Sequence, residues 1–245
     1  STPQLLNSST PQLMTRILIT GASKGIGFET ALALCRQEYN VLALSRDEEG
    51  LSQLQTAAEG ASGSLDTLRY DLMQPDTASL LEWINRQGGL DVLINNAGLL
   101  LNKPFAELTM ADWQESFSVN LFGAVSLIQT VMPFLQVSAT AHIVNIGSMG
   151  GFQGSSKFPG LSAYSASKAA LANLTECLAE ELKDSGISVN CLALGAVQTE
   201  MLAMAFPGYQ APVNKEDMGS FVAWFATQGG RFFNGKILPV SVSTP

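Results

Sequence analysis

Charged side chains, cysteines and histidines are all scarce in this chain. Only 14% of its 245 residues are charged, and the excess of acidic residues gives a net charge of −8. Nucleic acids and anionic membranes attract clustered Lys and Arg, so we expect neither as a partner. No apolar run approaches the ~20 residues that a membrane-spanning helix needs, which argues against a membrane protein.

The three cysteines, Cys35, Cys177 and Cys191, are odd in number and have no CxxC spacing. This pattern predicts reduced thiols and a cytoplasmic location. The single histidine, His142, opens a predicted strand and is expected to be structural. The paired Glu180 and Glu181 are expected on a solvated helix end, so we predict no metal site.

Residues 1–13 contain the stretch STPQL twice and lack the basic region and apolar core of a signal peptide. A strand-like run begins shortly after Met14. We expect residues 1–13 to be a non-native or disordered leader. Residues 14–245 are expected to form one domain, because no linker-like break in composition interrupts them.

Short apolar runs alternate with longer stretches of helical periodicity along the rest of the chain. The runs predict strands at 16–20, 40–45, 65–71, 91–98, 142–148, 187–194 and 236–242. Helices are predicted at about 26–37, 47–59, 76–86, 110–136, 162–184 and 215–228. Such alternation requires right-handed crossovers, and strands that are apolar throughout have both faces covered. The prediction is an α/β fold, a Rossmann-like, doubly wound, seven-stranded and mainly parallel sheet with helices on both faces.

A glycine-rich segment, TGASKGIG (20–27), joins the first strand to the first helix. Glycines at this junction let the backbone approach a pyrophosphate, and the helix N-terminus offers N–H donors. The spacing is GxxxGxG rather than GxGxxG, and such a segment can also be only a tight turn. Its place in the first strand–helix unit favours a dinucleotide. The expected cofactor contacts here are Gly21, Ser23, Lys24, Gly25, Ile26 and Gly27.

The end of the second predicted strand bears on which dinucleotide binds. An acidic residue there would accept hydrogen bonds from the adenosine ribose, but this chain has Ser45 and Arg46. Together with Lys24, Arg46 suits a ribose 2′-phosphate, so we predict NADP(H) rather than NAD(H). Asp47, which follows directly, opposes this preference.

Tyr164 and Lys168 lie four residues apart at the start of a predicted helix, so they share one face. The tyrosine pKa, near 10, is high for acid–base work at neutral pH, but a neighbouring ammonium favours the phenolate. The pair can then give a proton to a carbonyl or take one from an alcohol. Ser148, at the end of the fifth predicted strand, can hold the carbonyl oxygen. The spacing alone is also common in helices without a catalytic role.

The ordered set TGASKGIG, NNAG (95–98), Asn120, Ser148 and YSASK (164–168) resembles the short-chain dehydrogenase/reductase family in its compact single-domain form. The resemblance runs from about residue 15 to the C-terminus. It implies that Tyr164 is the catalytic acid/base, that Lys168 lowers its pKa and binds the nicotinamide ribose, and that Ser148 orients the substrate. It also implies that Asn120 holds a water that relays protons to Lys168.

Further cofactor contacts follow from the same resemblance. NNAG corresponds to a motif that steadies the sheet and lines the cofactor, with Asn95 and Gly98 nearest to it. Asp71 corresponds to an adenine contact, and Val197 and Thr199 to contacts with the nicotinamide carboxamide. Leu194 stands where the family has proline, which changes the rigidity of that loop. Beyond the glycine loop the expected set is Ser45, Arg46, Asp71, Leu72, Asn96, Ala97, Gly98, Tyr164, Lys168, Gly195, Val197 and Thr199.

Substrate contacts are expected from segments 99–108, 149–163 and 200–214. The last segment supplies Met201, Met204, Phe206 and Tyr209. These side chains suit an apolar carbonyl substrate, although they equally suit a surface loop docked on the core.

The stretch between Ser148 and Tyr164 is longer than is usual in the family that the chain resembles. We expect Phe152, Lys157 and Phe158 to project over the substrate mouth. A plain surface loop is the alternative.

The predicted function is NADPH-dependent reduction of a small, mostly apolar aldehyde or ketone, or the reverse oxidation of an alcohol. A 3-oxoacyl-[acyl-carrier-protein] reductase is the first alternative. Acidic carrier proteins need a basic docking patch, and 13 Lys and Arg leave little for one. The second alternative is a non-catalytic NADP(H)-sensing or interaction protein, which would be expected to lose Tyr164 or Lys168.

The resemblance also implies self-assembly. Members of the family pair the helices that correspond to about 110–136 and 162–184 across a two-fold axis. Small residues in the second of these helices permit close packing, namely Ala166, Ala169, Ala170 and Ala172. A homodimer or homotetramer is therefore expected.

Overall fold

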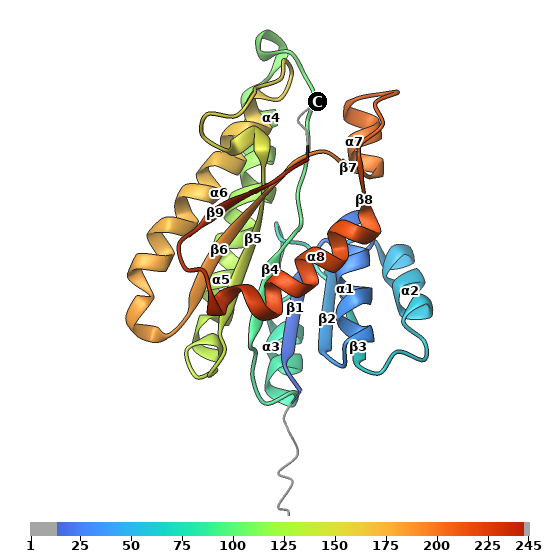
Figure 1. The fold of residues 1–245 in the computed structure, drawn as a ribbon, viewed down its shortest axis with the longest axis vertical. Coiled ribbons are helices and arrows are strands. Elements are labelled where there is room, and N and C mark those ends of the chain that lie inside the picture. The colour runs from blue at the N-terminus through green and yellow to red at the C-terminus, as the bar shows by residue number, and fades with distance from the viewer. Residues whose placement is uncertain (1–13, 243–245) are drawn as a thin grey trace, which may run out of the picture.

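Seven parallel strands form the central sheet of the computed structural model, which describes residues 14–242 (Figure 1). The strands are β1 (Arg16–Thr20), β2 (Asn40–Ser45), β3 (Ser64–Arg69), β4 (Val92–Asn95), β5 (His142–Ser148), β6 (Ser188–Leu194) and β9 (Ile237–Val240). Their order is β3-β2-β1-β4-β5-β6-β9. The order reverses between β1 and β4, which leaves a crevice for a ligand at the carboxyl ends of these strands. The predicted doubly wound sheet is confirmed. The predicted leader, residues 1–13, lies outside the described residues.

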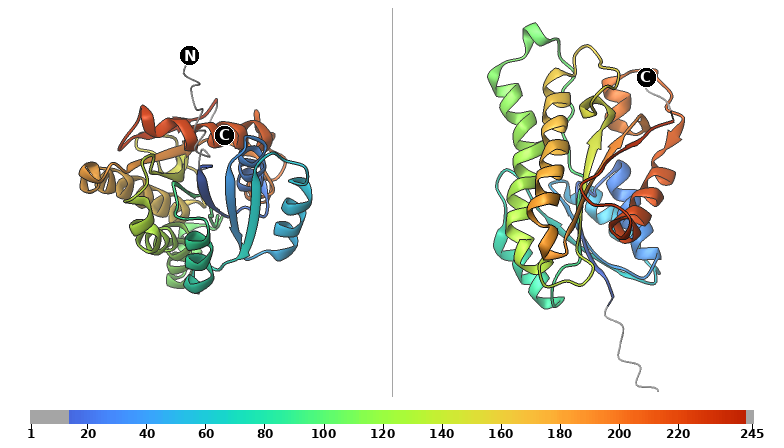
Figure 2. Two further views of the ribbon diagram at one scale, coloured as in Figure 1. Left: turned by 90° about the horizontal axis from the view of Figure 1, so that it is seen from below. Right: turned by 60° about the vertical axis from the view of Figure 1, so that its left-hand side comes forward.

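Helices cover both faces of the sheet (Figure 2). One face carries α1 (Gly25–Arg36), α2 (Glu48–Ala57) and α8 (Lys215–Gln228), and the other carries α3 (Thr77–Arg86), α5 (Gly123–Leu135) and α6 (Ser162–Glu181). Successive side chains of β1 enter opposite cores, Ile17 and Ile19 the first and Leu18 the second. Two apolar cores on one sheet explain why the strands are apolar throughout.

The helix expected over 110–136 is interrupted. α4 (Met110–Phe117) leads into a π-helical turn, Ser118–Phe122, before α5 begins. A π-turn inserts one extra residue into the helix, so it rotates the side chains beyond it, and such turns are frequent at functional sites.

The same helical run differs from the sequence-based expectation in a second way. Met110–Leu135 is long and apolar enough, by length and composition alone, to cross a membrane, and an 18-residue stretch within it has a mean hydropathy of 1.5. In the fold, however, Leu127, Val131 and Leu135 are buried against the sheet. The part of the run that forms α5 therefore packs one face against the sheet.

Three short elements lie outside the sequence-based predictions. Between β6 and α8 the chain forms β7 (Val197–Gln198), α7 (Glu200–Ala205) and β8 (Val213–Asn214). β7 and β8 pair in a separate two-stranded sheet. The strand predicted over 91–98 ends at Asn95, because the N–H of Asn96 turns back to the carbonyl of Ile94.

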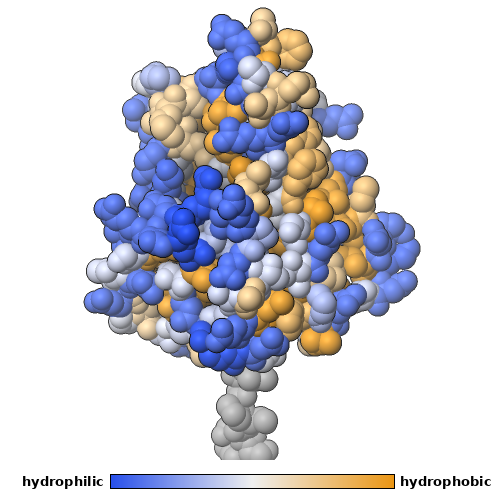
Figure 3. All heavy atoms as spheres, turned by 180° about the vertical axis from the view of Figure 1, so that it is seen from behind, coloured by the Kyte–Doolittle hydropathy of each residue, from blue (hydrophilic) through white to orange (hydrophobic). Residues whose placement is uncertain are grey.

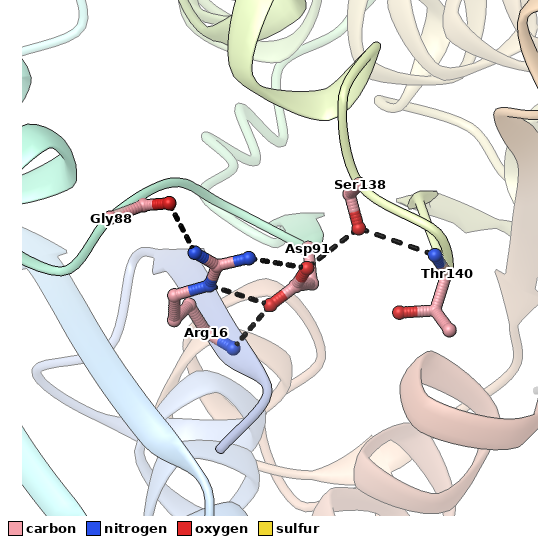
Figure 4. Close-up of polar contacts among 5 residues, drawn as sticks. All are labelled: Arg16, Gly88, Asp91, Ser138 and Thr140. Atoms are coloured by element: carbon pink, nitrogen blue, oxygen red, sulfur yellow. Dashed lines mark hydrogen bonds and ion pairs between the residues drawn. The ribbon is translucent and has the colours of Figure 1, made fainter. Parts of the chain in front are cut away.

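An ion pair closes the amino edge of the sheet, at the opposite end from the crevice (Figure 4). The Arg16 guanidinium bonds both carboxylate oxygens of Asp91 at 2.8 Å. Ser138, in the connection between α5 and β5, donates its hydroxyl to the same carboxylate at 2.6 Å. Asp91 therefore joins the starts of β1, β4 and β5.

Candidate active site

A cleft of about 680 Å³ lies at the carboxyl ends of β1, β4 and β5. Except for Asn95, its walls contain every residue that the sequence predicts to bind the cofactor, from Gly21 in the glycine loop to Thr199 after β7. Ser148, Tyr164 and Lys168 lie on the same wall, but Asn120 does not. The fold thus brings segments separated by well over a hundred residues to one cavity.

The glycine loop is tight because its backbone packs on itself. Gly21 and Gly25 have φ of 68° and 59°, in the left-handed region that favours glycine. A Cβ on Gly27 would lie 2.3 Å from the carbonyl oxygen of Gly21. Lys24 provides no side-chain cap for α1, so the first N–H groups of this helix remain available to an anion.

Two residues hold the loop against β4. Asn96 donates its side-chain amide to the carbonyls of Thr20 at 2.9 Å and of Gly21 at 3.1 Å. The Thr20 hydroxyl in turn accepts the N–H groups of Asn96 and Ala97, both at 3.0 Å. Thr20 is absent from the sequence-based predictions, because only the pairing of β1 with β4 gives it this role.

The two cations predicted for a 2′-phosphate line the cleft. Lys24 and Arg46 are both exposed, and neither has an ion-pair partner within residues 14–242. Asp47 is the N-cap of α2 and accepts the N–H of Gly50 at 3.1 Å. Asp47 also lines the cleft beside Arg46, so its carboxylate still opposes a bound phosphate there. Ser45 joins β2 to the glycine loop by donating to the Ser23 hydroxyl at 2.9 Å.

Tyr164 and Ser148 meet where the first turn of α6 reaches the end of β5. Burial raises the pKa of the Tyr164 hydroxyl above its ordinary value, and a hydrogen bond with Ser148 partly opposes this rise. Ser148 also accepts the N–H of Gly150 at 3.1 Å, which orients its hydroxyl. In the protein alone, burial therefore raises the pKa of Tyr164, whereas the sequence-based expectation is that Lys168 lowers it.

Lys168 lies behind Tyr164 on the same face of α6. Its side chain is buried, with the residue only 3% exposed, and its Nζ donates to the carbonyl of Ile146 in β5 at 2.8 Å. Burial lowers the pKa of this ammonium to about 8, while Cys191 beneath it acts in the opposite direction. The pKa of Lys168 thus lies close to physiological pH.

Asn120 lies behind the wall of the cleft, in the π-turn. Its Oδ1 accepts the N–H of Leu99 at 2.7 Å, and its Nδ2 donates to the Leu99 carbonyl and to the Ser167 hydroxyl, both at 2.9 Å. A Cβ on Gly98 would lie 3.4 Å from both Asn120 Oδ1 and Lys168 Nζ, so these two side chains meet at Gly98. The amide braces the backbone here, and its implied water relay stays a prediction.

One predicted placement is wrong. Asn95, expected nearest to the cofactor, is buried in the sheet and donates to Asn145 Oδ1 at 2.9 Å, because strand alternation turns it away from the cleft. Its neighbours Asn96, Ala97 and Gly98 line the cleft instead. His142, by contrast, has the structural position expected of it: it opens β5 and is buried between Ala226 and Asn190, and burial lowers its pKa to about 4.

The substrate end of the cleft is apolar. Its lining residues are Leu100, Val119, Met149, Phe158, Leu161, Met201, Leu202 and Phe206. Phe158 and Phe206 meet edge to face with their ring centroids 5.8 Å apart. Of these, Met201, Phe206 and Phe158 are residues that the sequence analysis predicts by name at the substrate site.

Four residues predicted over the substrate mouth lie elsewhere. Phe152, Met204 and Tyr209 are not part of the cleft wall, and Met204 is 73% exposed. Lys157 bonds its own loop, donating to the Phe152 carbonyl at 2.7 Å and the Ser155 hydroxyl at 2.6 Å.

Known proteins match this chain in both sequence and structure. The sequence model of the short chain dehydrogenase family matches residues 15–210. The ketoacyl reductase HetN of Nostoc sp. is 35% identical over 188 residues, which cover 76% of this chain and 64% of HetN, just under two thirds of that relative. The 3-oxoacyl-[acyl-carrier-protein] reductase FabG of Thermotoga maritima is 33% identical over 186 residues, which cover 75% of this chain and 74% of FabG.

Among solved structures, acetoin dehydrogenase from Enterobacter cloacae is 31% identical to this chain and has a TM-score of 0.79. The match covers 93% of this chain and 94% of that one. Since one family accounts for most of the length, this chain belongs to the short-chain dehydrogenase family and is an oxidoreductase of alcohol or ketone substrates that uses a nicotinamide cofactor, NAD or NADP.

Proposed function

We propose that this chain is an NADPH-dependent reductase of a small, mostly apolar aldehyde or ketone, or an alcohol dehydrogenase in the reverse direction. The observation that carries the proposal is the meeting of Ser148 and Tyr164 at the apolar end of a cleft whose other end offers a phosphate-binding loop. A carbonyl oxygen between the two hydroxyls would leave its apolar substituents against side chains such as Phe206.

The chain's own residues account for the proton and for orientation. A nicotinamide held in the cleft would supply the hydride for the carbonyl carbon. Ser148 holds the carbonyl oxygen by a hydrogen bond, and Tyr164 gives that oxygen its hydroxyl proton, so the products are an alcohol and a tyrosinate. Lys168, when protonated, stabilises this tyrosinate by its charge until a solvent proton restores the hydroxyl.

A substitution of Tyr164 tests the proposal directly. With a panel of aldehydes and ketones, Tyr164→Phe is expected to lower kcat by about 10²- to 10⁴-fold, because the proton donor is lost. The Kd for NADPH should change little. Tyr209→Phe is the matched control, since Tyr209 does not line the cleft.

Two results separate the alternatives. Full turnover by Tyr164→Phe would remove this tyrosine from the reaction. A wild-type protein that binds NADPH tightly but turns over no carbonyl would favour the non-catalytic NADP(H)-sensing function.

The cofactor preference rests on Lys24 and Arg46. Arg46→Ala is expected to lower kcat/KM for NADPH by about 10- to 100-fold, the range of a charge-assisted hydrogen bond, and to leave the value for NADH nearly unchanged. Arg69→Ala is the control, because this exposed arginine ends the neighbouring strand and pairs with Glu48 outside the cleft. A wild-type protein equally efficient with both cofactors would overturn the preference.

A 3-oxoacyl-[acyl-carrier-protein] reductase is the second candidate, favoured by the similarity to HetN and FabG. The basic residues near the mouth argue against it. Lys103 is paired with Asp112 at 2.8 Å, and Lys157 is bonded within its own loop. Comparing kcat/KM for carrier-linked and free 3-oxoacyl substrates decides between the two. A large preference for the carrier-linked form would establish the second candidate.

We also propose that the protein is a homodimer or homotetramer. Exposed aromatic and apolar side chains gather at α4, with Phe105 and Met110 each 72% exposed and Phe122 57% exposed. Trp113 and Phe117 lie between them with ring centroids 6.3 Å apart. The rear view in Figure 3 shows apolar surface between hydrophilic areas on one side of the molecule. Light scattering that gives a monomer would contradict this assembly.

A cytoplasmic location is proposed from the cysteines. Cys35, Cys177 and Cys191 are all free, as is usual in a reducing compartment. The net charge of −8 opposes binding to nucleic acid or to an anionic membrane surface.

A further inference from the structure

Three segments enclose the substrate end of the cleft. They are the chain after β4 (residues 99–103), the loop between β5 and α6 (residues 149–161) and the short helix α7. Each follows a different strand, so the sheet alone does not fix their positions relative to one another. Contacts between the segments must do so.

Asn102 bonds the first segment to α7. Its Nδ2 donates to the carbonyl of Ala205 at 2.7 Å. Ala205 is the last residue of α7, and the final carbonyls of a helix have no partner within the helix. The bond therefore holds the end of α7 that leads to Phe206, which lines the cleft.

The same residue packs against the second segment. Gly160 has φ of 85°, and a Cβ there would lie only 2.0 Å from Asn102 Oδ1. The N–H of Lys103 donates to the Gly160 carbonyl at 2.9 Å. Asn102 thus lies between Gly160 and Ala205, at the junction of all three segments.

The first segment is anchored to the body of the domain, so it can position the others. Lys103 Nζ pairs with Asp112 at 2.8 Å, and Asp112 also forms the capping box of α4 with Thr109. At the other end, Leu99 is held by the side chain of Asn120. Asn102 therefore joins α7 to a segment that is fixed at both ends.

We infer that Asn102 is a positioning residue that holds α7 over the carbonyl site, so that Met201, Leu202 and Phe206 close on an apolar substrate. The inference rests on the proposed function and identifies what closes that site. Asn102 is absent from the cleft wall, so it acts only through Ala205 and the residues that follow. A single neutral hydrogen bond biases closure by about 5- to 10-fold, which still allows substrate entry and product release.

The test is Asn102→Asp in the full-length protein. The substitution keeps the size of the side chain and replaces the N–H donor by an oxygen facing the Ala205 carbonyl. KM for a small apolar ketone should rise about 5- to 10-fold, while the Kd for NADPH stays within about twofold. Amide hydrogen exchange across residues 200–206 should become faster. Asn102→Gln, which keeps a donor, should recover part of the lost affinity.

Asn85→Asp is the matched control. Asn85 is exposed at the end of α3, so this substitution adds the same negative charge far from the cleft. Wild-type KM and unchanged exchange in Asn102→Asp would overturn the inference. So would a higher KM with unchanged exchange in α7. If the wild-type protein reduces no carbonyl, the proposed function fails, but the exchange experiment still tests the contact between Asn102 and α7.

Discussion

Lys168 is a buried cation that the proposed reaction needs, but its burial destabilises the folded protein. The ammonium has the Ile146 carbonyl as its hydrogen-bond acceptor within the described residues, and burial lowers its pKa from 10.5 to about 8. The folded state thus releases this proton more readily than the unfolded state. Between pH 8 and about 10.5 the unfolded chain binds more protons at this site, so the lysine's contribution to stability rises with pH there and is lowest below pH 8.

Replacing this cation should therefore stabilise the protein. Lys168→Met is expected to raise the free energy of unfolding at pH 7 by about 1–3 kcal/mol, less than the full shift because the Ile146 bond is lost, while turnover falls steeply. Urea unfolding of wild type and variant from pH 7 to 10 measures the difference. Cys35, whose pKa burial raises to about 11, is common to both proteins and cancels. Cys191 does not cancel, because the charge of Lys168 lowers its pKa, so the stabilisation is read at pH 7, well below the pKa of about 11 to which burial raises this thiol. A variant less stable than wild type would contradict the argument.

At the scale of secondary structure, the π-turn between α4 and α5 places Asn120 at the site. Gly123, the first residue of α5, lies so close to Leu72 that a Cβ there would be 2.8 Å from the leucine Cβ. The helix pair therefore packs directly on the loop after β3. With the extra residue of the turn, Asn120 faces Leu99 and Ser167 rather than solvent.

Ser167 is the contact that joins this turn to α6. Ser167→Ala removes the acceptor for one buried N–H of Asn120, so the free energy of unfolding should fall by about 1–2 kcal/mol. We expect kcat to fall as well, because Lys168 is the next residue and Asn120 adjoins it at Gly98. Ser220→Ala is the control, since Ser220 only bonds the carbonyl of Glu216 on the surface of α8. Equal effects of the two variants would mean that the Asn120 contact contributes nothing.

At the scale of the whole molecule, the two edges of the sheet have different roles. The carboxyl edge carries the cleft, and the amino edge is closed by Arg16, Asp91 and Ser138 (Figure 4). Burial raises the pKa of the Asp91 carboxyl, but hydrogen bonds from Arg16 and Ser138 outweigh it and hold the pKa below its ordinary value. This stabilisation is present above about pH 4 and is lost as the pH falls through the folded-state pKa.

Removing the charge of Asp91 should therefore destabilise the protein without affecting catalysis. Asp91→Asn is expected to lower the free energy of unfolding at pH 7 by about 2–3 kcal/mol, because it leaves the Arg16 guanidinium without its partner. kcat and KM below the unfolding temperature should stay unchanged, since the cleft lies at the other edge. Glu180→Gln, which breaks only an exposed pair with Lys183, should change stability by less than about 0.5 kcal/mol. Loss of activity in folded Asp91→Asn would show coupling between the edges.

The strands, the glycine loop and the shared face of Tyr164 and Lys168 were open to prediction from the sequence because each depends on neighbours within a few residues. Apolar periodicity, glycine and four-residue spacing are local signals. The convergence of Ser148 and Tyr164 could also be expected, since one ends a strand and the other begins the next helix. The family resemblance adds Asn120 and the contacts after β6.

Only the tertiary structure decided features that join distant segments. The sequence cannot tell which asparagine of NNAG faces the cleft, because that depends on the residue at which β4 ends beside β1. The same holds for Thr20 beneath the glycine loop, for Asp47 as a helix cap and for Asn102 between Gly160 and Ala205. Each of these side chains has several polar partners available in an unfolded chain, and packing alone selects one of them.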